Sequence, residues 1–593
     1  MGLLADILNA GKVMPPPASW PIRFATYVCT LSVLYAIGRR GMDWLRASDA
    51  HESESIWPWV APPSGDPTQH PNAHPRDQRH PVRQISATFA LISLCWLPYA
   101  ILLYPGVIWY DTEQQLLQWG GLPNVYTDGQ LNDHHPIFDT MLYGLFMDAG
   151  RALGSADAGI FVFSLLQMLF TAGVVAVFLY SLGMLGASRR AQRFVGVLLC
   201  AFPPVPIWAC AVAKDSTNLP FLLTFILLLF IGPVTISNGI PQRRLSVLHP
   251  KAWTAALTCC ACFITLTKKT GAIFIIFVTI MYLARWIRHE IHMRRPIRAQ
   301  RQCHIAHVQQ QCSEQKRSGA ATHISGERTI ISALICAAVC SLSLICLIMP
   351  LIVLPLFHIM PGGKQELLGQ AFQQAALTLS KHAESMSDAD RQAFTDMLGH
   401  DATARYAYWT VDSVKGDTWS PQQEQALPAF LKAWVSEGIR HPITYMQSYL
   451  AVEQGWFAFP HSSDSDHNAY LTPTPTHMVT RHFDGAGQLG LTFNDGRIAG
   501  VMEDTISWFQ ESPIGMLTSS KALWSTWALI FLIEESRRHR TAMKTLIPLI
   551  AWNAILWLSP VTTTDETMRY LMPVFFLVPL TVAMLTTREA STA

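Results

Sequence analysis

Long apolar stretches recur along the whole of this 593-residue chain, and they constrain its fold more than any other feature. A helix that crosses a bilayer needs about 20 mostly apolar residues, because the hydrocarbon core is about 30 Å thick. Half of the residues are apolar and only 14% are charged, whereas soluble domains carry about 25% charged residues. The sequence therefore predicts an all-α, polytopic membrane protein. About eleven transmembrane helices are expected, at 22–38, 84–104, 157–184, 194–212, 217–236, 252–267, 271–287, 329–357, 515–534, 541–558 and 568–586.

Lysine and arginine collect in connections that all fall on one side of these spans. The basic connections are 39–83, 189–193, 243–244, 285–328 and 537–540. Cytoplasmic loops carry such an excess of positive charge, so this side is predicted to be the cytoplasm, and the C-terminus falls on it. The expected location is the cell (plasma) membrane, with the alternate loops extracytoplasmic.

The half-apolar segment 136–154 decides whether this alternation holds. If it crossed the bilayer, the cluster Arg189, Arg190 and Arg193 would lie outside. Its apolar residues fall on one helical stripe, and Asp139 and Asp148 interrupt it. We therefore expect an amphipathic helix that lies flat in the outer membrane interface.

The spans divide the chain into four parts. Residues 1–83 are an N-terminal anchor helix with a basic cytoplasmic linker, and 84–357 are a membrane core with a first outer loop at 105–156. Residues 358–514 are an extracytoplasmic, mainly helical domain, and 515–593 are the C-terminal transmembrane helices. In the outer domain, Ser420-Pro421 with Gln423 has the pattern of a capped helix start, and Pro442 opens a further helix.

The sequence lacks the motifs that several classes of function require. No basic run is interleaved with aromatic residues as a nucleic-acid groove requires, so no nucleic-acid partner is expected. There is no GxxxxGK[ST], no Rossmann glycine fingerprint and no HExxH. These absences disfavour an ATP-driven pump and any enzyme with a soluble nucleotide-binding domain.

Two acidic residues follow the Pro105-Gly106 break that ends the second span. Asp111 and Glu113 could serve as a general base or as ligands of a divalent cation, Mg²⁺ or Mn²⁺, at the outer membrane face. Asp111 with Gln114 three residues later is equally the pattern of a helix N-cap. The residues alone leave both interpretations open.

The same outer loop contains Asn132-Asp133-His134-His135-Pro136. A histidine pair beside a carboxylate could hold a metal or shuttle protons. Pro136 also suits the first position of the interfacial helix, which would make His135 or a neighbour its cap. Adjacent histidines on a loop are more often ordinary polar residues.

Four cations lie at the predicted outer ends of spans, where short loops are normally poor in positive charge. They are Lys214, the pair Lys268-Lys269, and Arg569. Ionisable groups at membrane depth are costly and tend to be functional, and four on one rim suit an anion such as a lipid phosphate. The alternative is that they anchor helix ends by reaching toward the headgroups.

The outer domain offers aromatic residues that could stack on the apolar face of a sugar. Tyr445, Tyr449 and Trp456 are the candidates for acceptor binding. The same residue types form the aromatic belts of membrane proteins, so the two interpretations are even.

With these residues in view, the chain resembles GT-C type membrane glycosyltransferases, and more specifically a family of large bacterial multi-pass membrane proteins of that build. The resemblance covers most of 84–593 and depends on Tyr104-Pro105-Gly106, Asp111-Thr112-Glu113, Asn132–Pro136, Ala213-Lys214-Asp215-Ser216 and Arg569-Tyr570. It implies a GT-C-like core in which the first outer loop carries a catalytic acidic residue, and Asp111 matches that position. It also implies a polyprenyl-phosphate-linked sugar as the donor.

The leading hypothesis is therefore a glycosyltransferase with Asp111, supported by Glu113, as the base and Arg569, Lys214, Lys268 and Lys269 as the site of the donor phosphate. The acceptor would be a cell-envelope glycan, lipid or protein. Asp133, His134 and His135 are supporting residues or metal ligands. Two alternatives are a polymerase or ligase of lipid-linked glycans and a polysaccharide or lipid transporter without chemistry.

Overall fold

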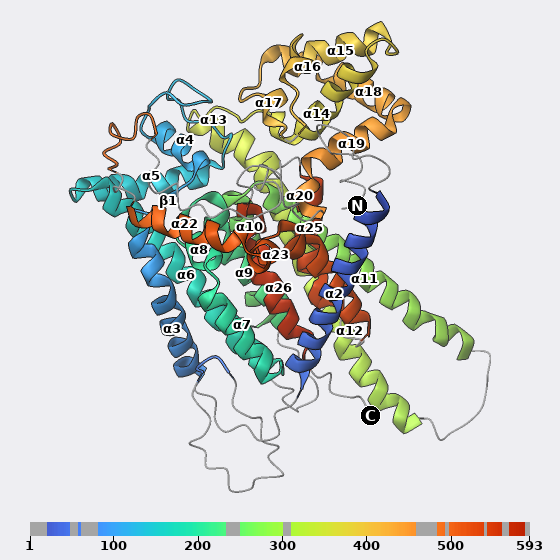
Figure 1. The fold of residues 1–593 in the computed structure, drawn as a ribbon. Helices are drawn as coiled ribbons and strands as arrows, with labels where there is room; N and C mark the ends of the chain where they lie inside the picture. The colour runs from blue at the N-terminus through green and yellow to red at the C-terminus, as the bar shows by residue number, and fades with distance from the viewer. Residues whose placement is uncertain are drawn as a thin grey trace.

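The computed structural model describes residues 20–47, 57–60, 81–232, 249–300, 310–408, 410–457, 483–492, 497–538, 543–559 and 568–587. Within these ranges the chain is helical apart from turns, a few isolated bridges and one pair of two-residue strands. Figure 1 shows a bundle of long helices, with a group of shorter helices that covers one end of it.

Five helical segments of the described residues are long and apolar enough to cross a membrane. They are α3 (Pro81–Leu102), α6 (Ala156–Met184), α9 (Lys214–Ile231), the first part of α11 (Thr270–Gln300), and a run through α12 (Gln310–Ser343), η3 (Leu344–Val353) and α13 (Leu354–Leu356). Two shorter apolar helices are α25 (Ile547–Leu558) and α26 (Met568–Met584). The protein is thus an all-α membrane protein, as the sequence predicts.

Within the described residues, two of the predicted spans are interrupted by residues that are not helical. Residues 194–212 form α7 (Arg189–Ala201), then α8 (Pro204–Ala209) and the strand β2 (Ala211–Val212). The break falls at Pro203-Pro204, because a proline removes a backbone donor and clashes with the preceding turn. Residues 515–534 are divided among α23 (Pro513–Thr518), η5 (Leu523–Trp527) and α24 (Ala528–Arg538).

The remaining helices of the bundle pack around these. They are α2 (Trp20–Arg46), α10 (Pro250–Thr267) and the short η6 (Met543–Leu546). One continuous apolar core joins the bundle from Met42 to Leu585. At one edge of it, Arg46 of α2 pairs with the buried Glu535 of α24 at 2.8 Å.

The predicted interfacial segment is helix α5 (Ile137–Ala152). In Figure 1 it lies across the ends of α3 and α6 rather than alongside them. Gly150 and Gly159 let the backbones of α5 and α6 approach closely, since a Cβ on Gly150 would lie 2.5 Å from Gly159. This crossing places α5 beside α4 (Tyr110–Trp119), the helix that carries Asp111.

The described part of the region after the fifth apolar run is mainly helical, and its helices are joined by turns and irregular segments such as 358–364 and 483–492. Its helices are α14 (Gln365–His382), α15 (Asp388–Leu398), α16 (Ala402–Arg405), α17 (Asp412–Lys415), α18 (Pro421–Arg440), α19 (Pro442–Val452), α20 (Gln454–Phe457) and α22 (Arg497–Glu511). A separate core around Phe372, Phe394 and Phe430 holds the first five together. Ser420 and Gln423 form the predicted capping box, with each side chain bound to the other's backbone N–H.

Candidate functional site

Asp111 is the centre of a buried cluster of charges. Its Oδ2 accepts from the guanidinium of Arg569 and lies 2.7 Å from the Nζ of Lys214. All three side chains are about five-sixths buried, with exposed fractions of 15 to 17%. Although burial alone would raise the pKa of Asp111, Arg569 and Lys214 hold it well below its usual range. The carboxylate is therefore charged at neutral pH.

Two short parallel strands explain why Asp111 and Lys214 meet. β1 (Val107–Ile108) pairs with β2, and each strand runs directly into a helix, β1 into α4 and β2 into α9. Asp111 is the second residue of α4, and Asp215 is the second residue of α9. The helix dipole favours a negative charge in this first turn.

The N-cap interpretation of Asp111 is wrong. The cap of α4 is Trp109, which has extended backbone angles and makes no side-chain capping hydrogen bond. Asp111 lies inside the helix and its carboxylate is bound to cations instead of backbone N–H groups. This leaves its side chain directed at the charged cluster.

Asp215 is the second carboxylate of the cluster. It pairs with Lys268, and its other oxygen lies 3.9 Å from the Nε of Arg569. The Nζ of Lys268 also sits over the ring of Tyr570, 4.2 Å from its centroid. Arg569 therefore bridges Asp111 and Asp215, and three of the four predicted outer cations gather around these two carboxylates.

His135 closes one side of the cluster. Its Nδ1 lies 3.1 Å from the Nζ of Lys214, and its Nε2 lies 3.2 Å from the hydroxyl of Tyr126. Burial, followed by the charge of Lys214, holds the pKa of His135 well below its usual value. The imidazole is thus neutral, and because Nδ1 accepts from Lys214, its proton is on Nε2.

The fourth predicted cation, Lys269, takes part in a neighbouring contact. It lies 2.9 Å from a carboxylate oxygen of Asp133. Asp133 also accepts from the backbone N–H of Ile137, the first residue of α5, at 3.3 Å. The N-cap of α5 is Pro136, which the sequence had placed at the first helical position, one residue further on. His134 stacks on Tyr126 with ring centroids 4.0 Å apart.

The helical region contributes a charged pair of its own. Glu366, near the start of α14, lies 3.4 Å from the Nε2 of His134 and 2.7 Å from the Nζ of Lys415. Burial would raise the pKa of Glu366, but His134 and Lys415 lower it. A backbone bridge between Asn132 and Met360 ties the same loop to the start of this region. The loop of Asp133 and His134 is therefore held from both sides.

Glu113 does not share the orientation of Asp111. Residues two apart on a helix point about 200° away from each other, and Glu113 is only 2% exposed within α4. Its carboxylate thus enters the protein on the other side of the helix from the cluster. It remains a predicted supporting residue.

The three candidate aromatic residues lie in packed positions. The hydroxyl of Tyr445 donates to the carbonyl of Trp434, and that of Tyr449 donates to the carbonyl of Trp557 at 2.6 Å. Trp456 is fully buried in the bundle core. In this conformation the ring of Trp456 is enclosed by protein, so it could stack on a sugar only after moving.

Sequence reasoning missed several residues of this site. Asp215 was visible as an acidic residue beside Lys214 at the start of an apolar span, which is the signal that could have found it. Glu366 and Tyr126 had none, because their partners are far away in the chain. Asp139 of α5 is fully buried, and none of the described residues donates a hydrogen bond to its carboxylate oxygens. Burial raises the pKa of Asp139 well above the usual value.

The geometry of the described residues does not support the predicted metal site. Across the described ranges, no group of three or more histidine, cysteine, aspartate or glutamate side chains lies in a position to hold a metal ion. Asp133, His134 and His135 each face a different partner, as set out above.

The fold and the site together define an all-α membrane protein with a buried ion-pair cluster formed where membrane helices begin and end. Comparison with known families identifies its relatives: the chain belongs to a family of unknown function, DUF6020, whose model matches residues 122–296 and 328–593. Lys214, Lys268, Lys269 and Arg569 lie within the matched segments, and Asp111 precedes them. No curated protein and no solved structure matches the chain.

Proposed function

We propose that this protein is a glycosyltransferase of the GT-C type. It moves a sugar from a polyprenyl-phosphate donor to a cell-envelope acceptor, at the extracytoplasmic face of the plasma membrane. In this proposal the chain crosses the bilayer about eleven times, its C-terminus is cytoplasmic, and the helical region at 358–514 is extracytoplasmic.

The observation that supports the proposal most is the net charge of the buried cluster. Asp111 and Asp215 supply two negative charges, and Lys214, Lys268 and Arg569 supply three positive ones. The adjacent Lys269–Asp133 pair is neutral overall, and so is His135. The cluster is thus one positive charge in excess, which matches the single negative charge of a phosphodiester. A sugar joined to a polyprenyl phosphate is such a phosphodiester.

The charges of the cluster and of the phosphate also stay balanced through the reaction. The acceptor hydroxyl attacks the anomeric carbon, a bond forms between them, and the bond from that carbon to the phosphate oxygen breaks with its electron pair left on the phosphate. Asp111 takes the hydroxyl proton and becomes neutral, so the cluster gains one positive charge. The departing polyprenyl phosphate, as a monoester with a second pKa near 6, carries close to two negative charges. Cations and anions are balanced before and after transfer.

Donor binding would also make Asp111 a better base. In the free protein Arg569 and Lys214 lower the pKa of Asp111, which makes the carboxylate a weak base. A phosphate that draws these two cations away removes the cause of that shift. The proton acceptor then becomes stronger only when the donor is in place.

The position of the cluster suits a lipid-linked substrate. The N-terminal ends of α4 and α9 add positive potential beside the cations. Lys214 and Arg569 lie at the ends of apolar helices, so a polyprenyl tail could remain in lipid while its phosphate reaches them.

The test uses purified protein in vesicles that contain a polyprenyl phosphate carrying a radiolabelled sugar, incubated with cell-envelope acceptors. We expect label in an envelope fraction. Asp111→Asn should reduce transfer by at least about 100-fold, the usual contribution of a general base. Arg569→Ala should have a similar effect, because it leaves the leaving group without its main counter-charge.

Controls separate catalysis from folding. Asp388→Asn changes an exposed carboxylate that pairs with Arg391 on the surface of α15, and it should keep full activity. Membrane insertion and the melting temperature of each variant are measured alongside. Full transfer by Asp111→Asn would refute the assignment of the base.

The alternatives are outcomes of the same experiment. Products that lengthen with time, one glycan joined to the next, would indicate a polymerase or ligase. Movement of the labelled lipid across the membrane without a new covalent product would indicate a transporter. A divalent cation, Mg²⁺ or Mn²⁺, remains a predicted cofactor that chelation of the reaction mixture would test.

A further inference from the structure

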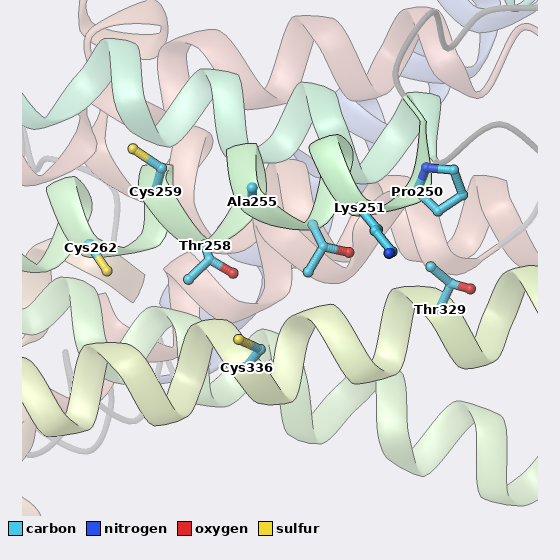
Figure 2. A pocket seen from close by; sticks show the side chains of 9 residues that line it. Pro250, Lys251, Ala255, Thr258, Cys259, Cys262, Thr329 and Cys336 are labelled. Carbon is cyan, nitrogen blue, oxygen red and sulfur yellow. The ribbon is translucent and has the colours of Figure 1, made fainter.

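A groove of about 710 Å³ opens between α10 and α12, away from the charged cluster. Figure 2 shows the side chains that line it, which come from one stripe of α10 and from the facing side of α12. Thr254, Ala255, Thr258 and Cys262 lie on α10, and Cys336 lies opposite on α12. The walls are mainly apolar, so the groove offers little to a water-soluble ligand.

One end of the groove is positively charged. Lys251, in the first turn of α10, is exposed, and in Figure 2 its ammonium points toward Thr329 of α12. Within the described ranges no acidic side chain forms an ion pair with Lys251.

The groove contains a polar atom without a partner. The hydroxyl oxygen of Thr258 is buried, and no hydrogen-bond partner reaches it from the part of the chain that the structure describes. Thr258 is one of the residues that line the groove. A ligand with an oxygen acceptor between its charged head and its apolar tail would satisfy this hydroxyl.

The charged mouth lies near the opposite bilayer surface from the Asp111 cluster. Lys251 and Lys268 flank the two ends of α10, which has 18 residues. At 1.5 Å per residue such a helix is about 27 Å long, close to the thickness of the hydrocarbon core. A lipid with its phosphate at Lys251 therefore belongs to the other leaflet. It is not the lipid whose phosphate would reach Arg569.

We propose that this groove binds an anionic glycerophospholipid. One acyl chain lies along the groove, an ester carbonyl accepts from Thr258, and the headgroup phosphate pairs with Lys251 at the membrane surface. Basic pockets between membrane helices are a recurring site for anionic lipid headgroups. The lipid would fill the gap between α10 and α12 and thereby support the helix that ends at Lys268.

The test measures lipid binding to the full-length protein, without any assay of transfer. Delipidated protein in detergent is titrated with phosphatidylglycerol or with phosphatidylcholine of the same chains, and bound lipid is counted by native mass spectrometry. Phosphatidylglycerol should bind more tightly than phosphatidylcholine. Lys251→Gln should weaken the binding of phosphatidylglycerol by about fivefold, the usual effect of one basic residue at an anionic surface.

Two further variants make the result specific. Ala255→Trp would fill the groove and should abolish the binding of both lipids. Lys432→Gln removes an exposed lysine from α18, far from the groove, and should change nothing. Equal affinity for the two lipids, or a Lys251→Gln variant that binds like Lys432→Gln, would overturn the proposal. So would a polyprenyl phosphate that displaces phosphatidylglycerol and binds more tightly in a Lys251-dependent way.

Discussion

The buried pair between Lys268 and Asp215 gives the sharpest test of the site, because it requires no substrate. Both side chains are at least nine-tenths buried, with exposed fractions of 6% and 2%. Removal of one partner of a buried pair leaves an uncompensated charge and typically costs about 3–5 kcal/mol, whereas replacement of both is often neutral. We therefore expect Asp215→Asn to lower the free energy of unfolding by about 3–5 kcal/mol. Lys268→Met should cost less, because Arg569 still lies 3.9 Å from Asp215.

The double variant Asp215→Asn/Lys268→Met should recover most of the loss. Unfolding in detergent, followed by tryptophan fluorescence, measures all four proteins of the double-mutant cycle. The coupling free energy between the two positions should be about 3 kcal/mol. Asp388→Asn, which breaks a surface pair, should stay within about 0.5 kcal/mol of the wild type. A double variant as unstable as the sum of the two single variants would refute the reasoning.

The pH dependence of the same variants provides an independent check. Burial lowers the pKa of Lys268, and Asp215 partly offsets that effect, so Asp215→Asn should lower it further. Between this folded pKa and about 10.4, the unfolded chain binds a proton that the folded protein does not. Stability therefore rises with pH across that window, by up to about 1.4 kcal/mol per pH unit. Asp215→Asn should regain stability from pH 7 to pH 9 relative to the wild type, and Lys268→Met should not.

Three further predictions concern packing, capping and acid sensitivity. Gly150→Ala would place a Cβ 2.5 Å from Gly159 and should lower the free energy of unfolding by about 1–3 kcal/mol. Gly487→Ala is the control, because a Cβ at Gly487 meets open space. Equal unfolding free energies for the two variants would contradict the close crossing of α5 and α6. Ser420→Ala removes the capping box of α18 and should lower the free energy of unfolding by about 1 kcal/mol. An unchanged free energy of unfolding would show that the capping box is not formed. Because the pKa of Glu366 is lowered in the fold, its stabilising effect is present above about pH 4.3 and is lost in acid. Glu366→Gln should therefore flatten the acid side of the stability profile, and an unchanged profile from pH 7 to pH 3 would refute the pairing.

Local patterns predicted much of the helical architecture. Long apolar runs located the five membrane-length segments, since their length and composition are set by the bilayer. Pro421 and Pro442 both open helices where the sequence placed them, because a proline at a first helical position is a local signal. The prediction of one membrane-spanning helix at 194–212 was wrong, because it followed the apolar composition and disregarded the helix break that Pro203-Pro204 indicates.

The candidate site was predictable only in part. Lys214 and Arg569 stood out as cations on a membrane rim that should be poor in them, and both contact Asp111. The sequence contains no signal that assigns them carboxylate partners, because each pair joins residues far apart in the chain. Glu366, which pairs with His134 and with Lys415 in the helical region, was missed for that reason.

The step that the sequence hides most completely is the pairing of β1 with β2. Two-residue strands show no periodicity, and β1 and β2 are separated in the chain by the five helices α4 to α8. Yet the register of the two strands makes Asp111 and Asp215 equivalent in position. Each is the second residue of the helix that follows its strand. Two helix N-termini are thereby set side by side, each with an aspartate in its first turn, and one arginine can reach both carboxylates. A different register would turn one aspartate away from Arg569, so the charge balance of the whole cluster depends on these two backbone pairs.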